Sequence, residues 1–142
     1  MVVVPDNVKI IGTAAFEGNQ NIERIVLPDK LEEIQYNAFA SMPKLERIVV
    51  DDKVTKIGPS AFANCPNLSY VYLGKSVEER GDTPFSGCEK LQTVDLGSLT
   101  TVGYGNEFSG CESLQTVKVH EGDPVGIVSK FDDSVEIFNA LY

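Results

Sequence analysis

The stretch VTKIGPSAFANCPNLSYVYLGKS at residues 54–76 is one complete copy of a 23-residue pattern. The pattern can be written V-x-x-I-G-x-x-A-F-x-x-C-x-x-L-x-x-V-x-L-x-x-x. Six of the seven phenylalanines recur with this period, at Phe16, Phe39, Phe62, Phe85, Phe108 and Phe131. A fixed period of this length is typical of solenoids, in which each unit buries its apolar face only against its neighbours. The sequence therefore predicts a stack of similar coils.

Apolar residues recur at fixed offsets around each phenylalanine. The positions six, nine and eleven residues later are occupied by Ile22, Leu45, Leu68, Leu91 and Leu114, by Ile25, Ile48, Val71, Val94 and Val117, and by Leu27, Val50, Leu73, Leu96 and Val119. This L-x-x-V-x-L segment is short, alternating and rich in β-branched residues, so it predicts a strand. Parallel stacking of these strands predicts one sheet along one side of the solenoid.

The A-F-x-x-C-x-x-L segment is too short for a full helix. It predicts one helical turn or 3-10 turn on the side opposite the sheet. Gly12 and Gly58, each one residue after a core isoleucine, indicate a bend where a side chain would crowd a neighbour or where φ is positive.

The I-G-x-x-A-F-x-x-C/N-x-x-L unit resembles the BspA-like class of leucine-rich repeats, over residues 1 to about 122. The resemblance implies an α/β fold: a right-handed leucine-rich-repeat solenoid with a parallel sheet on its concave face and short helical or 3-10 turns on the other. Members occur mostly in bacterial cell-surface proteins and in some protist proteins, usually with a role in adhesion to host proteins. The resemblance therefore implies an extracellular or cell-surface location.

The period divides the chain, taken as a single domain over residues 1–142, into successive coils. We expect a partial repeat at 1–7, full repeats at 8–30, 31–53, 54–76, 77–98 and 99–121, and a degenerate terminal repeat or cap at 122–142. In the last unit Ile137 lies 23 residues after Leu114. The N-terminal coil shows no polar cap of the kind that solenoids need. Either the natural protein extends further, or the open coil packs on another molecule, which would include end-to-end self-association.

Two repeats depart from the pattern. Arg80 occupies the position of the inward-facing Ile34 and Ile57. In the next repeat one residue is lost after Leu96 and one is gained near Gly103–Asn106, before Phe108. The inserted segment is either a local bulge or a loop that contacts a partner.

The charge balance excludes two classes of partner. The 142 residues include 21 acidic and 12 basic side chains, which gives a net charge of -9. Nucleic acid and anionic membrane surfaces both require a basic footprint, so neither is expected as the main partner. No apolar run approaches the roughly 18 residues of a membrane span, and the first residues do not have the pattern of a signal peptide.

No constellation of catalytic or metal-binding residues is found. Cys65, Cys88 and Cys111 occupy one inward position of the repeat, which predicts buried free thiols that pack as small apolar groups. No histidine or acidic residue shares that position, so we expect no metal site. His120, the single histidine, is expected in an exposed turn. Because there is no nucleophile–base pair and no phosphate-binding loop, we expect neither an enzyme nor a cofactor.

The outward positions of the strand segment provide the candidate site. They form an apolar row of Val3, Val26, Val49 and Tyr72, flanked by Arg24, Arg47 and Tyr70. Exposed valine, tyrosine and arginine side chains are typical of interface centres, although β-branched residues also simply favour strands. The protein-binding residues predicted are Arg24, Val26, Arg47, Val49, Tyr70 and Tyr72. The hypothesis is a non-enzymatic protein-interaction module of an adhesion-type surface or secreted protein. The alternative is a passive structural spacer in a larger multidomain surface protein.

Overall fold

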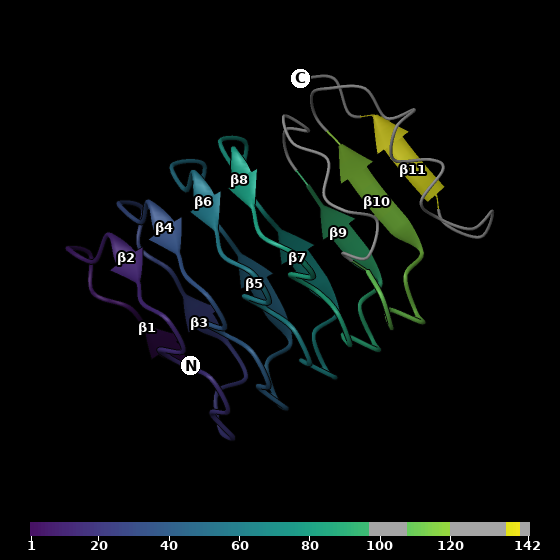
Figure 1. The fold of residues 1–142 in the computed structure, drawn as a ribbon, viewed down its shortest axis with the longest axis horizontal. Helices are drawn as coiled ribbons and strands as arrows, with labels where there is room; N and C mark the ends of the chain where they lie inside the picture. Colours follow the sequence, from purple (N-terminus) through teal and green to yellow (C-terminus); the bar gives the residue numbers. More distant parts are fainter. Residues whose placement is uncertain (97–107, 120–135, 140–142) are drawn as a thin grey trace.

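The L-x-x-V-x-L segments form a row of parallel strands in a computed structural model, which describes residues 1–96, 108–119 and 136–139. The row contains β1 (Val2–Val3), β3 (Ile25–Val26), β5 (Arg47–Val49), β7 (Tyr70–Tyr72), β9 (Thr93–Asp95), β10 (Thr116–Val119) and β11 (Glu136–Asn139). β1 pairs with β3, and β5, β7, β9, β10 and β11 form one continuous ladder. A single bridge between Arg24 and Arg47 joins the two ladders. We call this row sheet 1 (Figure 1).

The register of sheet 1 reproduces the 23-residue period. Val2 pairs with Ile25, Arg47 with Tyr70, and Thr93 with Thr116. β11 is the exception, because Ile137 pairs with Val117, only 20 residues earlier. The assignment of Ile137 to the position of Leu114 is therefore wrong, and the final coil is three residues shorter than the others. The insertion at Gly103–Asn106, His120 and the segment before β11 lie outside the described residues.

A second sheet, which the sequence analysis did not predict, runs beside the first. β2 (Ile10–Ile11), β4 (Glu33–Ile34), β6 (Lys56–Ile57) and β8 (Glu79–Arg80) pair in parallel, and Figure 1 shows them as a separate row. We call this row sheet 2. Each strand contributes one outward and one inward residue; the inward ones include Ile34 and Ile57, which are buried. A two-residue strand is too short to show an alternating pattern, so sequence periodicity could not reveal it.

The expected helical or 3-10 turns are not formed, and the described residues contain no helix. In the first full coil the amides of Ala14, Phe16 and Gly18 donate to carbonyls of the next coil, whereas the amides of Ala15 and Glu17 donate to the carbonyl three residues earlier and close single four-residue turns. Ala14 and Gly18 also have φ values of 56° and 71°. An α-helix needs an unbroken run of negative φ and bonds within one segment, so this alternation excludes it. The described fold is a parallel β-solenoid, and the α/β class is corrected accordingly.

The phenylalanines stack through the centre of the solenoid. Adjacent rings from Phe16 to Phe108 have centroids 5.3–5.6 Å apart and are inclined by 4–10°. Phe39, Phe62 and Phe85 are completely buried. The repeated strand positions Leu45, Ile48, Leu68 and Val71 close the core between the stack and sheet 1. Because each ring contacts the ring of the next coil, burial in one coil depends on its neighbours.

A candidate protein-interaction surface on sheet 1

The register of sheet 1 places the six predicted protein-binding residues beside one another. Val49 lies next to Tyr72, and Arg47 lies between Arg24 and Tyr70. Their outward orientation follows from strand alternation, because the intervening Ile25, Ile48 and Val71 are buried. We call Arg24, Val26, Arg47, Val49, Tyr70 and Tyr72 the Val–Tyr–Arg stripe.

The valines of the Val–Tyr–Arg stripe are unusually exposed for apolar side chains in a strand. Val26 and Val49 are 46% and 45% exposed, and Val3, which pairs with Val26, is 61% exposed. Tyr70 and Tyr72 are half-buried. An exposed apolar row that spans several coils is a feature of interaction surfaces, because it costs free energy when it faces water.

The polar groups of the stripe are held by contacts within the chain. The Arg47 guanidinium lies 5.2 Å from the centroid of the Tyr70 ring, a cation–π contact. Arg24 Nε lies 3.6 Å from Glu46 Oε2, an exposed ion pair of the kind that contributes little stability. The Tyr72 hydroxyl donates to Asp52 Oδ1 over 2.8 Å, which fixes the ring on the sheet.

A shallow groove of about 270 Å³ crosses the stripe. It is lined by Met1, Arg24, Ile25, Val26, Leu27, Arg47, Val49 and Asp51. Asp51 was not predicted, because it lies one residue beyond the L-x-x-V-x-L segment. The alternation of inward and outward residues could have identified Asp51. Val50 is buried, so the next residue along the chain faces outward.

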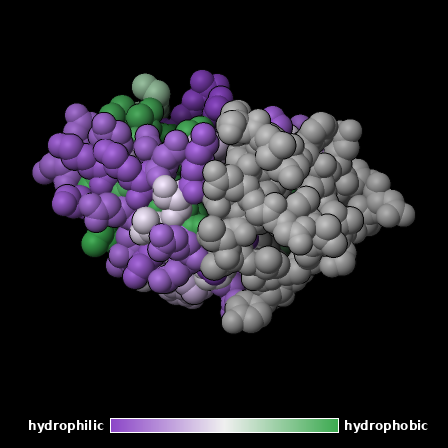
Figure 2. All heavy atoms as spheres, turned by 90° about the horizontal axis from the view of Figure 1, so that it is seen from above, coloured by the Kyte–Doolittle hydropathy of each residue, from purple (hydrophilic) through white to green (hydrophobic). Residues whose placement is uncertain are grey.

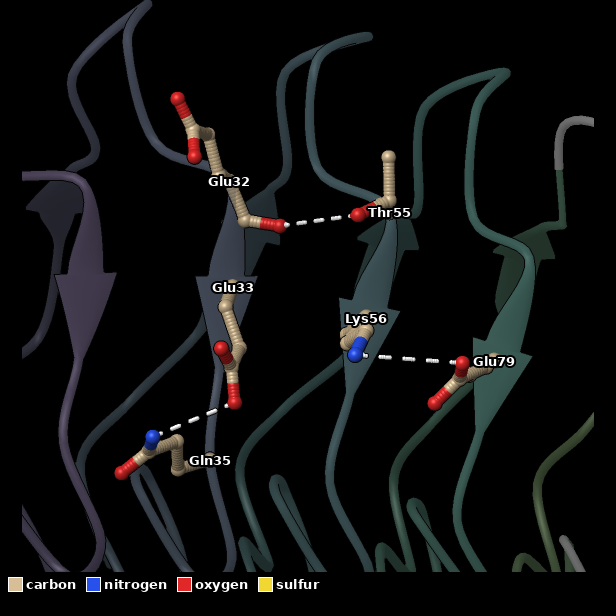
Figure 3. Close-up of polar contacts among 6 residues, drawn as sticks. All are labelled: Glu32, Glu33, Gln35, Thr55, Lys56 and Glu79. Carbon is tan, nitrogen blue, oxygen red and sulfur yellow. Dashed lines mark hydrogen bonds and ion pairs between the residues drawn. The ribbon is translucent and has the colours of Figure 1, made fainter.

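The outer face of sheet 2 is different in character. Lys56 Nζ lies 3.9 Å from Glu79 Oε1, and Gln35 Nε2 donates to Glu33 Oε1 over 3.1 Å (Figure 3). Ile10, which is 50% exposed, is the only apolar residue at an outward position of its strands. Most of the residues coloured on the face in view in Figure 2 are hydrophilic, and hydrophobic ones are seen at its upper edge and in smaller patches below. Exposed apolar side chains thus align over several coils on sheet 1 and not on sheet 2.

Two of the three cysteines are buried free thiols, as predicted. Cys65 and Cys88 are completely buried, and their thiols donate to the carbonyls of Phe39 and Phe62 over 3.1 Å. Burial raises the pKa of Cys65 to about 11 and raises the pKa of Cys88 as well. Cys111 is only half-buried. A thiol that stays protonated at neutral pH is a poor nucleophile, so these residues form part of the packing.

Across residues 1–96, 108–119 and 136–139, no three histidine, cysteine or acidic side chains come close enough together to hold a metal ion. The same residues contain no helix that is long and apolar enough to cross a bilayer. The Val–Tyr–Arg stripe remains the candidate site.

Comparison with solved structures identifies similar folds. PcpA, a pneumococcal vaccine antigen, matches with a TM-score of 0.78 and 20% identity, over 99% of this chain and 35% of its own. The leucine-rich repeat protein TpLRR of T. pallidum matches with a TM-score of 0.76 and 28% identity, over 99% of this chain and 72% of its own. A leucine-rich repeat protein of Eubacterium ventriosum matches with a TM-score of 0.72 and 24% identity, over 84% and 32%. The chain thus spans only about a third of two of these structures.

Sequence comparison agrees with the repeat pattern. No curated protein matches the chain by sequence. A family model for the BspA type leucine rich repeat region matches residues 1–115 as six copies. Since this match covers most of the chain, and the coils, register and phenylalanine column follow the same period, the chain belongs to the BspA-type leucine-rich repeat family.

Proposed function

We propose that the chain is a non-enzymatic protein-interaction module of a bacterial cell-surface or secreted, adhesion-type protein. It binds a protein partner through the Val–Tyr–Arg stripe of sheet 1. The observation that carries the proposal is the exposed row of Val26 and Val49, continued by Tyr72 and bordered by two arginines. Aromatic and arginine side chains around an apolar centre are the composition of interface hot spots.

The proposed location rests on the family. Membership of the BspA-type family implies a bacterial cell-surface location, and the structurally similar PcpA is a pneumococcal vaccine antigen. A surface-exposed role also suits the acidic composition, since a net charge of -9 favours solubility over attachment to anionic membranes.

The test compares substitutions at outward positions of the two sheets. The immobilised chain is used to select binders from a library of displayed random peptides, and the same binders are then measured on variants. Val26→Glu with Tyr72→Glu should weaken binding at least tenfold, because charge replaces the apolar centre. Ile10→Glu on sheet 2 is the matched control and should leave binding unchanged. Urea unfolding shows whether each variant is folded.

A passive structural spacer is the second candidate function. The continuous phenylalanine stack and the strand ladders link every described coil to the next, which would make a stiff support. If selection yields only binders that are indifferent to both sets of substitutions, the stripe has no binding role and the spacer function is favoured.

A further inference from the structure

Along one strand, the groove on sheet 1 is lined by a basic, an aliphatic and an acidic side chain in that order. Arg47, Val49 and Asp51 alternate with the buried Ile48 and Val50, so all three face outward and line the groove. Read along the chain, the groove presents a cation, an aliphatic side chain and an anion. Because alternate residues of a strand lie about 6.7 Å apart, this order is matched by an extended segment with the opposite order of charges.

The cationic end carries two guanidiniums. Arg24 is the direct neighbour of Arg47 in the adjacent coil. Like charges in neighbouring strands disfavour one another, and a carboxylate placed against both would remove that cost and form charge-assisted hydrogen bonds. In the structure Arg24 has a 3.6 Å ion pair with the exposed Glu46, and Arg47 lies against an aromatic ring. Both contacts are weak enough for a ligand carboxylate to compete with them.

The anionic end is available to a ligand. Asp51 is exposed, and its carboxylate forms no hydrogen bond or ion pair with the described residues. Asp52 differs, because its carboxylate accepts bonds from the Tyr72 hydroxyl and the Lys75 amide. Asp51 is therefore the acidic group in the groove that a basic ligand side chain can meet.

We infer that the partner presents an extended segment with an acidic, an aliphatic and a basic side chain at alternating positions, seated over Arg24 and Arg47, Val26 and Val49, and Asp51. The inference rests on the proposed function and specifies its partner. A second copy of this chain offers the same order through its own Asp51, Val49 and Arg47. The residues equivalent to Asp51 in the flanking coils are Pro28 and Gly74, so the order of charges is confined to one strand and matches one extended segment.

The test uses two labelled peptides that differ at one residue. Gly-Glu-Thr-Val-Thr-Lys-Gly carries the matching order, and Gly-Glu-Thr-Val-Thr-Glu-Gly places a second carboxylate against Asp51. Fluorescence anisotropy at low ionic strength should show the first peptide binding about tenfold more tightly, the difference expected for one close charge pair. Asp51→Lys should reverse this preference, and Glu79→Lys on sheet 2 should leave it unchanged.

The outcomes separate this inference from the proposed function. Equal binding of both peptides to the native chain, or a preference that Asp51→Lys does not reverse, overturns the inference. If peptides selected from the random library still depend on Val26 and Tyr72, the proposed function stands without it. Sedimentation velocity covers the second-copy alternative: a dimer that Asp51→Lys dissociates would make this chain its own partner and overturn the inference. Self-association through the N-terminal coil would be insensitive to Asp51.

Discussion

At the residue scale, one glycine position illustrates how closely the coils approach each other. An ideal Cβ at Gly58 would lie 2.6 Å from the backbone nitrogen of Tyr36 and 2.7 Å from the carbonyl carbon of Gln35. Gly12, Gln35 and Gly58 occupy the same position in three successive coils. An ideal Cβ at Gly12 would lie 3.9 Å from its nearest neighbouring atom, Gln35 Oε1. Neither glycine has a positive φ, so crowding by the preceding coil is what requires glycine at Gly58.

This difference predicts opposite outcomes for the same substitution. Gly58→Ala should destabilise the chain by about 2 kcal/mol or more, because backbone atoms of the preceding coil must move. Gly12→Ala should be neutral or stabilising by up to about 1 kcal/mol, since alanine restricts the unfolded chain without a native clash. Urea unfolding followed by circular dichroism measures both. Equal losses for the two variants would show that crowding is not the cause.

The raised pKa of Cys65 predicts a dependence of stability on alkaline pH. The folded state holds the thiol proton up to about pH 11, whereas the unfolded thiol releases it near pH 9. The folded chain binds more protons within that interval, so its stability is complete below pH 9 and falls as the pH rises to 11, by up to roughly 1.4 kcal/mol per pH unit.

Removing the thiol should flatten this part of the profile. Cys65→Ala should be less stable than the native chain at pH 8, by about 1 kcal/mol or more, because it loses the bond to the Phe39 carbonyl and some packing. Between pH 9 and 11 its stability should decline less steeply than that of the native chain. Parallel profiles over this range would contradict the burial of the thiol.

At the element scale, sequence periodicity predicted sheet 1 and could not predict sheet 2. The strands of sheet 1 belong to a segment with three recurring apolar positions, and the observed register follows that period from β1 to β10. The strands of sheet 2 contain one inward residue each, as at Ile34, and a single position carries no alternation. The turns were mistaken for helical turns because backbone bonds between coils leave no trace in side-chain pattern.

The candidate site, too, could be predicted only in part from the sequence. The alignment of the Val–Tyr–Arg stripe follows from a constant period, so counting residues was sufficient to predict it. The groove depends on where the chain turns after β5, and Asp51 enters it only because the outward alternation continues one step beyond the strand. The sequence pattern predicted which residues are neighbours, but the shape between them required coordinates.

The phenylalanine column predicts a gradient of stability along the stack. Phe62 is completely buried between Phe39 and Phe85, so Phe62→Ala should destabilise the chain by about 3–5 kcal/mol through lost burial and a cavity. Phe16 is only half-buried and has a stacking contact to Phe39, so Phe16→Ala should cost clearly less. Chemical unfolding of both variants is the measurement. Similar costs would mean that the rings do not act as one stack.

At the scale of the whole molecule, the charge is unevenly distributed along the solenoid. Residues 1–71 carry a net charge of -2 and residues 72–142 a net charge of -7. In the described part of the chain, the ion pairs Lys9–Glu32 at 3.7 Å, Arg24–Glu46 and Lys56–Glu79 are more than half exposed at both side chains. Pairs of this kind contribute little, so repulsion among the acidic groups is expected to dominate the electrostatic part of the stability.

Screening should therefore stabilise the chain. Raising NaCl from about 0.02 M to about 0.3 M shortens the range of charge interactions and should increase the urea midpoint, because it relieves more repulsion than attraction. Glu89 and Glu112 are exposed and occupy the same position of successive coils. Glu89→Gln with Glu112→Gln should raise the midpoint at low salt and reduce its salt dependence. A urea midpoint that falls as salt is added would show that attraction in the exposed ion pairs outweighs the repulsion. Charge interactions would then stabilise the acidic coils rather than destabilise them.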